Sequence, residues 1–307
     1  MKISIVSPVY KAEKIVSDLI CQISEALQSL THDYEILLVE DGSPDLSWQQ
    51  IKIAAMQDQH VKGIKLSRNF GQHVAISAGL QHANGDFVVV MDCDLQDNPH
   101  EIPSLFHEIN KGFDYVVAKR HQKKHTFLQR LSSRVFYAVF SYLTGSAQDS
   151  SIGNFGIYSR KVIDAVLEMN DQFKYFPAQV QWVGFERGVL LVKHMSRHSG
   201  NSTYNLRRLI ALALNNMLSF SDKPLRLSVA YGLFVSFFSF MLGAAYIILA
   251  ILGLITVSGF VSVIVSIFFT SGSIIIVIGM VGLYVGKTFE VAKNRPLYVI
   301  DSIVACS

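Results

Sequence analysis

The stretch from Leu227 to Gly286 contains no Asp, Glu, Lys, Arg or His. A helix needs about 20 apolar residues to cross a bilayer, so these roughly 60 residues are long enough for two crossings joined by a short turn. The sequence before Leu227 mixes charged and apolar residues as a soluble domain does, and it is long enough to bury a sizeable core. The sequence therefore predicts a soluble domain followed by a two-helix transmembrane hairpin.

The basic residues near the hairpin predict its orientation. By the positive-inside rule, the basic residues on both flanks and the uncharged turn near residues 256–260 indicate that both termini are cytosolic. The start of the chain, with a short apolar run ending at Pro8, is too brief for a secretory signal and is typical of a first strand. We expect a soluble domain over 1–203, an amphipathic juxtamembrane helix over 204–226, two spanning helices over 227–286 and a cytosolic tail over 287–307. The flanking basic residues are Arg207, Arg208, Lys223 and Arg226 on one side and Lys287, Lys293 and Arg295 on the other.

Charge and cysteine content exclude some functions. A net charge of +3 is too small to indicate nucleic-acid binding. The three cysteines, Cys21, Cys93 and Cys306, are odd in number and far apart, so they predict neither a zinc site nor a disulfide framework.

Apolar runs and longer mixed segments alternate in the first part of the chain. Alternation of this kind predicts an α/β fold with a doubly wound, mostly parallel sheet. We expect strands at Lys2–Val9, Glu35–Val39, Val61–Leu66, Phe87–Met91 and Tyr115–Ala118, and helices at Glu13–Leu30, Ser47–Gln57, Gln72–Ala83 and Glu101–Asn110.

Sheets of this type bind ligands beyond the carboxyl ends of their strands. The fourth expected strand is followed by Asp92, Asp94 and Gln96. In an extended segment these side chains would point to one side, since side chains alternate with a period of two. Hard oxygen donors in this arrangement suit Mg²⁺ or Mn²⁺, which can bridge a diphosphate. A solvated acidic loop is the other interpretation of the same residues.

Other phosphate chemistries fit less well. The Rossmann fingerprint and the P-loop both need a glycine-rich turn into a helix, and neither pattern is present. An aspartyl-phosphate phosphatase also has Asp-x-Asp after an apolar strand, but normally on the first strand. Such enzymes also place a small hydroxyl residue at the position that Gln96 occupies here.

Several motifs, in this order and spacing, resemble the family-2 inverting glycosyltransferases of the GT-A fold. Within that family the chain resembles the polyprenyl-phosphate branch, typified by dolichyl-phosphate mannose synthase and bacterial bactoprenol glucosyltransferases. The resemblance covers nearly the whole chain. It rests on residues 7–10 (SPVY), 39–43 (VEDGS), 66–71 (LSRNFG), 91–99 (MDCDLQDNP), 152–156 (IGNFG), 219–226 (SFSDKPLR) and 294–298 (NRPLY).

The resemblance implies a nucleoside-diphosphate sugar as donor, with uridine as the preferred base, and a polyprenyl phosphate, preferably undecaprenyl phosphate, as acceptor. The product would be a lipid-linked monosaccharide for modification of cell-envelope glycans, made at the inner membrane with inversion. Implied donor-site residues are Pro8, Tyr10, Glu13, Asp41, Arg68, Asp92 and Arg120; the Mg²⁺ or Mn²⁺ ligands are Asp92, Asp94 and Gln96; the acceptor-phosphate residues are Arg130, Arg134, Arg197 and Thr203; and the catalytic residues are Asp94, Arg130 and Asn154.

Three positions depart from the family pattern. Relatives often have Asn-Glu-Glu after the tyrosine, where this chain has Lys11-Ala12-Glu13. They often have an aspartate, a candidate catalytic base, where this chain has Asn154, and a phosphate-binding lysine where it has Thr203. Asparagine cannot act as a base, but a phosphate acceptor is already anionic near neutral pH, because its second pKa is about 6.

The departures leave a second function open: a catalytically weak membrane subunit that acts as a binding or scaffold partner. Amphipathic patterns at residues 127–143 and 204–220 favour contact with membrane lipids, although such helices also pack on domain cores. A homo-oligomer and a flippase for the lipid-linked sugar are further expected partners.

Overall fold

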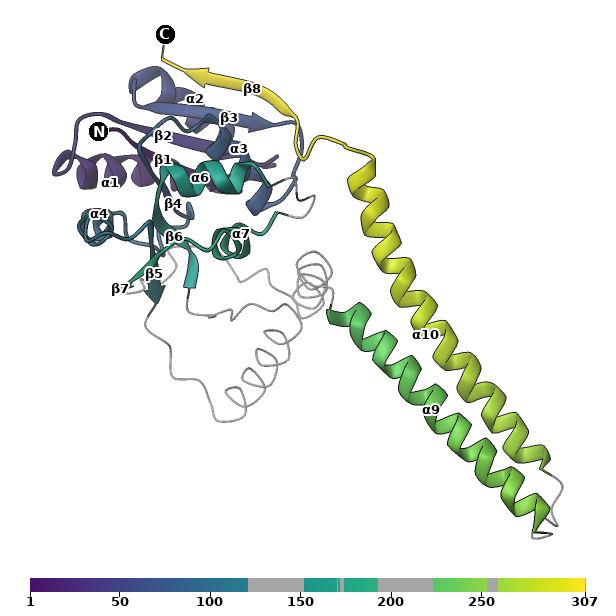
Figure 1. The fold of residues 1–307 in the computed structure, drawn as a ribbon. Helices are drawn as coiled ribbons and strands as arrows, with labels where there is room; N and C mark the ends of the chain where they lie inside the picture. Colours follow the sequence, from purple (N-terminus) through teal and green to yellow (C-terminus); the bar gives the residue numbers. More distant parts are fainter. Residues whose placement is uncertain (121–151, 170, 172–173, 193–222, 253–258, 307) are drawn as a thin grey trace. The chain divides into compact units, whose positions relative to one another are not determined.

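The computed structural model describes residues 1–120, 152–169, 171, 174–192, 223–252 and 259–306 (Figure 1). The described residues divide into two compact units. The first contains 1–120, the described part of 152–192, and 295–306, and the second contains the described part of 223–294. The two segments expected to be amphipathic, 127–143 and 204–220, lie outside the described residues.

The first unit is built on one mixed sheet of eight described strands, in the order β7-β5-β6-β4-β1-β2-β3-β8. Strands β4, β1, β2 and β3 are parallel neighbours, as are β5 and β7, whereas β6 and β8 run antiparallel to their neighbours. The prediction of a mostly parallel sheet is confirmed. The strands are β1 (Ile3–Val9), β2 (Tyr34–Glu40), β3 (Val61–Leu66), β4 (Phe87–Val90), β5 (Tyr115–Arg120), β6 (Ile152–Ser159), β7 (Arg187–Val192) and β8 (Ile300–Ala305).

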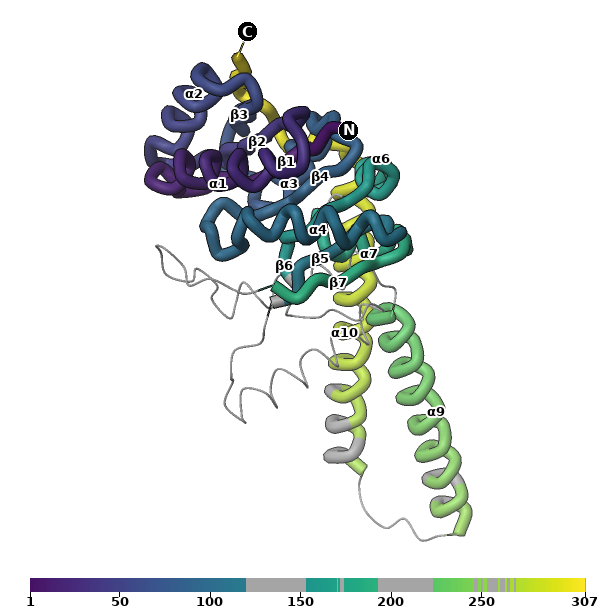
Figure 2. The backbone as a smooth tube through the Cα atoms, turned by 90° about the vertical axis from the view of Figure 1, so that its left-hand side faces the viewer, coloured from purple at the N-terminus to yellow at the C-terminus, as the bar shows by residue number. Residues whose placement is uncertain are grey.

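Helices cover both faces of this sheet (Figures 1 and 2). On one face, α1 (Val16–Gln28), α2 (Ser47–Gln57) and α4 (Ile102–Ile109) pack on strand residues such as Ile5. On the other face, α3 (Gln72–His82), α6 (Arg160–Leu167) and α7 (Phe176–Trp182) pack on residues such as Val6. Since both faces are buried, the central strands are apolar runs without alternation.

The strands and helices expected from the sequence are found within a few residues of their predicted bounds. Strands β6, β7 and β8 and helices α6 and α7 were not expected. Strand β6 has the sequence IGNFGIYS, and its two glycines and its asparagine hide the strand pattern.

The segment after the apolar hairpin returns to the sheet as β8, which pairs antiparallel with β3 (Figure 1). Just before this strand, the carbonyl of Val299 accepts a hydrogen bond from the amide of Ser67 at 2.9 Å. The hydroxyl of Tyr298 donates to the side chain of Gln81 on α3, and its ring packs on the core below α3. Residues 298–305 are therefore an integral part of the first unit.

The second unit contains α9 (Lys223–Ile251) and α10 (Phe260–Ala292), which lie side by side (Figure 2). Both are long and apolar enough to cross a membrane, over Lys223–Ala245 and Phe269–Ala292. Large apolar side chains are exposed along them, Phe240 by 76%. The hydroxyls of Tyr231 and Ser273 lie 3.0 Å apart and join the two helices. This pair is the candidate membrane hairpin that the charge-free sequence predicted.

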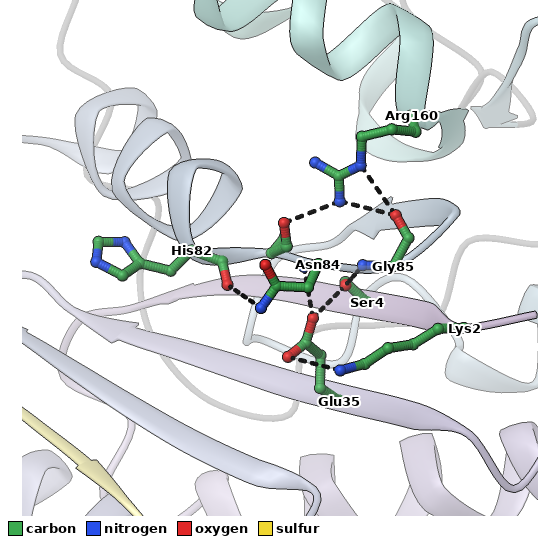
Figure 3. Close-up of polar contacts among 8 residues, drawn as sticks. Lys2, Ser4, Glu35, His82, Asn84, Gly85 and Arg160 are labelled. Atoms are coloured by element: carbon green, nitrogen blue, oxygen red, sulfur yellow. Dashed lines mark hydrogen bonds and ion pairs between the residues drawn. The ribbon is translucent and has the colours of Figure 1, made fainter.

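A polar network ties together the amino ends of β1 and β2 and the loop before β4 (Figure 3). The Glu35 carboxylate accepts hydrogen bonds from the Ser4 hydroxyl at 2.6 Å and from the Asn84 amide at 2.7 Å. The Arg160 guanidinium donates to the carbonyl of Gly85 at 2.7 Å and to that of Ala83 at 2.8 Å. Because the strands are parallel, this network lies at the edge of the sheet opposite their carboxyl ends.

Candidate functional site

The carboxyl ends of β4, β1 and β2 meet at one edge of the sheet, because these strands are parallel neighbours. Asp41 follows β2, Tyr10 follows β1, and the acidic segment 92–97 comes just after β4. This edge is where a doubly wound sheet binds its ligands.

Asp41 is buried and bonded to the loop that follows β3. Its carboxylate accepts hydrogen bonds from the main-chain amides of Phe70 at 2.7 Å and Gly71 at 2.9 Å. Its carbonyl accepts a third bond, from the side chain of Asn69 at 2.9 Å. Burial raises the pKa of Asp41, and the bonds from Phe70 and Gly71 partly offset that rise. The VEDGS and LSRNFG motifs thus form one hydrogen-bonded pair of loops.

The glycine after Asp41 allows these two loops to approach. Gly42 has φ of +63°, and a Cβ at this position would lie 2.3 Å from the main-chain nitrogen of Asn69. Any side chain at position 42 would therefore force the loops apart.

Glu40 shapes the same turn from the end of β2. Its carboxylate accepts a hydrogen bond from the amide of Ser43, and the hydroxyl of Ser43 in turn accepts one from the amide of Lys11 at 2.8 Å. Burial raises the pKa of Glu40. Glu40 therefore connects the end of β2 to the loop after β1.

The end of β1 and the loop after it hold three of the expected donor residues. Pro8 is buried in β1, whereas Tyr10 is 45% exposed. The carboxylate of Glu13 accepts a hydrogen bond from the amide of Leu46 at 3.1 Å, just before α2. Tyr10 is thus accessible to a ligand, whereas the carboxylate of Glu13 is hydrogen-bonded to the residue just before α2.

Asp92 is held by two side-chain amides from other elements. Its Oδ1 accepts a hydrogen bond from Nε2 of Gln72, the first residue of α3, at 2.6 Å. The same oxygen accepts one from Nδ2 of Asn154 in β6 at 3.1 Å. Asp92 and Asn154, both expected at the site, are therefore brought together, and Gln72 joins them.

The extended conformation expected for residues 92–96 is wrong. Strand β4 ends at Val90, the chain turns after Asp92, and Leu95 has φ of +55°. The Asp94 carboxylate accepts a hydrogen bond from the amide of Gln96 at 3.1 Å, which stabilises the turn. Burial raises the pKa of the intervening Cys93 to about 12, so this residue stays a neutral thiol.

Asp92 and Asp94 are the carboxylates available to a divalent cation after β4. Within the described residues, no three His, Cys, Asp or Glu side chains come together as a metal cluster. Mg²⁺ usually takes only one or two carboxylates from the protein and completes its shell with substrate phosphates and water. Asp92 and Asp94 are hard ligands two residues apart, so they fit an ion of this kind that arrives with a diphosphate.

The basic residues expected at the site are only partly described. The Arg68 guanidinium lies 4.2 Å from the ring centre of Phe70, in the loop that holds Asp41. Arg120 is the last residue of β5. Arg130, Arg134, Arg197 and Thr203 lie outside the described residues.

His73 was not anticipated from the sequence. Its Nδ1 is buried with no hydrogen-bond partner among the described residues. Its ring lies roughly perpendicular to that of Tyr175, with 4.8 Å between the ring centres. Burial lowers the pKa of His73 to about 4, so the ring is neutral near pH 7. His73 follows Gln72, and the only sequence signal for either residue is that they come directly after the LSRNFG motif.

A family model described as glycosyl transferase family 2 matches residues 4–167, more than half of the chain. The chain belongs to this glycosyltransferase family. Among its family-2 relatives is the undecaprenyl-phosphate 4-deoxy-4-formamido-L-arabinose transferase of Proteus mirabilis, 31% identical over 99% of this chain and 94% of that protein. The bactoprenol glucosyl transferase of Shigella phage SfV is 34% identical over 98% of this chain and 99% of its own length.

A family-2 chain should share its fold with solved glycosyltransferases, and it does. Glucosyl-3-phosphoglycerate synthase from Mycobacterium tuberculosis, crystallised with Mn²⁺, UDP-glucose and phosphoglyceric acid, superposes with a TM-score of 0.53 at 15% identity, over 71% of this chain and 78% of that one. Both the family and the GT-A fold expected from the sequence motifs are confirmed.

Proposed function

We propose that this family-2 chain transfers a sugar from a UDP-linked donor to undecaprenyl phosphate, with inversion, and so makes a lipid-linked monosaccharide for cell-envelope glycans. The observation that carries the proposal is the joint placement of Asp41 and Asp92 at one sheet edge, both held by residues 70–72. The relatives also support the proposal. The undecaprenyl-phosphate and bactoprenol sugar transferases are similar to nearly the full chain, whereas the family model matches only residues 4–167.

In this proposal the donor lies across the carboxyl ends of β2, β1 and β4. The nucleoside contacts Pro8, Tyr10 and Asp41, with Arg68 and Glu13 at its margin. Both Asp41 oxygens already accept main-chain bonds, but a carboxylate oxygen has two lone pairs, so each retains capacity for a base or ribose donor.

Charge stabilisation and placement of the acceptor complete the reaction. Bound Mg²⁺ or Mn²⁺, held by Asp92, Asp94 and Gln96, would neutralise the diphosphate of the donor. Arg120, Arg130, Arg134, Arg197 and Thr203 are proposed to bind the donor diphosphate and the acceptor phosphate, which suits the planar guanidinium group of arginine.

The proposed bond changes need no protein base. An oxygen of the acceptor phosphate forms a bond to the anomeric carbon, while the bond from that carbon to the diphosphate breaks and its electron pair leaves with the nucleoside diphosphate. The acceptor is anionic near neutral pH, its second pKa being about 6. Asn154 cannot act as a base, and this chemistry does not need one. Its side chain instead donates a hydrogen bond to Asp92.

The membrane setting is part of the proposal. The hairpin α9–α10 anchors the chain in the inner membrane with both termini in the cytosol, where nucleotide-sugars are made. The basic residues that flank the hairpin favour this orientation.

The test is transfer of radiolabelled sugar from UDP-sugars to undecaprenyl phosphate by the full-length protein in detergent, with Mg²⁺ or Mn²⁺. Asp94→Ala should lower turnover by about 100-fold or more, since the metal stabilises the leaving group. Asp18→Ala, an exposed position on α1, is the matched control and should leave turnover unchanged. Full activity of Asp94→Ala would reject the metal assignment. No lipid-linked label from any donor would favour the scaffold function instead.

A further inference from the structure

Three consecutive residues contact both carboxylates of the candidate site. The amides of Phe70 and Gly71 donate to Asp41, and the side chain of the next residue, Gln72, donates to Asp92 at 2.6 Å. We propose that Gln72 is a positioning residue which, together with Asn154, orients the metal-binding carboxylate of Asp92. This inference rests on the proposed function, because it takes Asp92 as a ligand of the donor's cation.

Gln72 is well placed for this role because its backbone is fixed. It is the first residue of α3, and the carbonyl of Gly71 accepts bonds from the amides of Val74 and Ala75, both at 3.0 Å. Farther along α3, a Cβ at Gly79 would lie 2.4 Å from Cγ1 of Val6, so the helix packs closely on β1. A side chain that starts from such a rigid element can hold its partner precisely in place.

The chemistry of the two donors matters as much as their position. The N–H groups that Gln72 and Asn154 direct at Asp92 cannot bind a cation, so these two contacts act on the metal through Asp92. Both donate to the same oxygen, Oδ1, and thereby fix the plane of the carboxylate. Partners of this kind around metal ligands are worth about 10- to 100-fold in metal affinity.

The identity of residue 154 fits the same role. An aspartate at this position would bring a second carboxylate to about the 3.1 Å that now separates Nδ2 of Asn154 from Asp92. Two such oxygens repel each other unless a proton or a cation lies between them. With neutral amides at both 72 and 154, Asp92 has two hydrogen-bond donors that hold it without a cation.

The test uses full-length protein in detergent and measures Mn²⁺ binding directly by electron paramagnetic resonance, with and without UDP. Gln72→Met keeps the length of the side chain and removes the donor, and Asn154→Ala removes the second donor. Each should weaken Mn²⁺ binding by about 10-fold or more. Gln49→Met, at an exposed position on α2, is the matched control and should bind as the wild type does.

Two further readouts separate positioning from general damage. The melting temperature without metal should change little in Gln72→Met, because the main-chain bonds of residues 70 and 71 remain. In a transfer assay, the Mn²⁺ concentration at half-maximal rate should rise, while kcat recovers at saturating Mn²⁺. A lower kcat that saturating Mn²⁺ does not restore would overturn the inference.

The binding outcomes also separate this inference from the proposed function. If the wild type binds Mn²⁺ and Gln72→Met binds it with the same affinity, the positioning role is overturned but the metal assignment is not. Absence of Mn²⁺ binding by the wild type, with UDP present, would overturn the metal assignment and the positioning role together. Because the readout needs no acceptor, an error in the proposed acceptor affects neither result.

Discussion

The main-chain amide of Gly71 donates a hydrogen bond of 2.9 Å to the carboxylate of Asp41, which lies 30 residues earlier in the chain. The adjacent amide of Phe70 donates to the other oxygen of the same carboxylate. A residue expected to contact the nucleotide therefore also holds the loop after β3 in place, so its loss should affect both folding and binding.

Replacing Asp41 with alanine should lower the free energy of unfolding by about 2 kcal/mol or more, because the amides of Phe70 and Gly71 both lose their acceptor. Asp41→Asn keeps one carbonyl oxygen and should lose less. Urea denaturation in detergent measures the difference. An alanine variant as stable as the wild type would show that water replaces the carboxylate at no cost.

The stability contribution of His73 should depend on pH between about 6.5 and 4. Its pKa falls from 6.5 to about 4 on folding, so in this range the unfolded chain takes up a proton that the folded chain does not. The contribution is therefore complete above pH 6.5 and is lost as the pH falls toward 4. After allowance for partial exposure, we expect a loss of about 2 kcal/mol.

His73→Phe isolates this effect, since phenylalanine does not titrate and can keep the edge contact with Tyr175. The free energy of unfolding of the variant should fall less steeply than that of the wild type between pH 6.5 and pH 4. Equal slopes for the two proteins would contradict the prediction.

Ending the chain after Asn294 should destabilise the first unit, because it removes β8 and leaves the edge of β3 unpaired. We expect the melting temperature to fall by about 5 °C or more, which corresponds to about 2 kcal/mol for a domain of this size. Stabilisation by UDP should also weaken, since Ser67, next to the loop that holds Asp41, loses its bond to Val299.

Asp301→Ser is the control for this truncation. It removes an exposed ion pair with Lys65 at 3.1 Å and a long hydrogen bond from the Ser302 hydroxyl at 3.5 Å, so it should cost well under 1 kcal/mol. A truncated chain that melts at the wild-type temperature would show that β8 adds nothing to the sheet. If the truncation lowers the melting temperature as expected, a soluble variant of the protein should omit the hairpin but keep residues 295–305, which include β8.

Arg160→Lys should lower the free energy of unfolding by about 1 to 2 kcal/mol, because an ammonium group cannot reproduce the fork that binds the carbonyls of Ala83 and Gly85 (Figure 3). Its Mn²⁺ affinity should equal that of the wild type, since Arg160 lies at the amino ends of the strands. Weaker Mn²⁺ binding in this variant would indicate that the two edges of the sheet are coupled.

The central part of the fold could be predicted from the sequence because its signals are local. Apolar runs such as Phe87–Val90 have few alternatives to a buried strand. A polar residue just beyond a run, such as Asp41, is then expected at a strand end. The last strand could not be predicted in this way. Its sequence, IDSIVA, is short and follows a long apolar stretch, and it becomes a strand only because β3 offers it a free edge.

The site was predictable in its carboxylates but not in their partners. Asp92 and Asp94 stand out because a carboxylate is costly to place beside a core unless it is paired or coordinates a metal. Gln72 carries no such signal, since a glutamine at the start of a helix is ordinary. Its role depends on α3 packing across β1, and the turn after Asp92 likewise depends on the positive φ of Leu95, which no periodicity reveals.

The position of β8 also sets an order of events during synthesis. A ribosome makes residues 300–305 only after both apolar helices, so the edge of β3 stays unpaired until the hairpin has emerged. The first unit therefore acquires β8 only after the apolar hairpin α9–α10 has been made. A nascent chain that stalls within the hairpin would have an incomplete sheet, and its exposed β3 edge would be open to quality-control proteases.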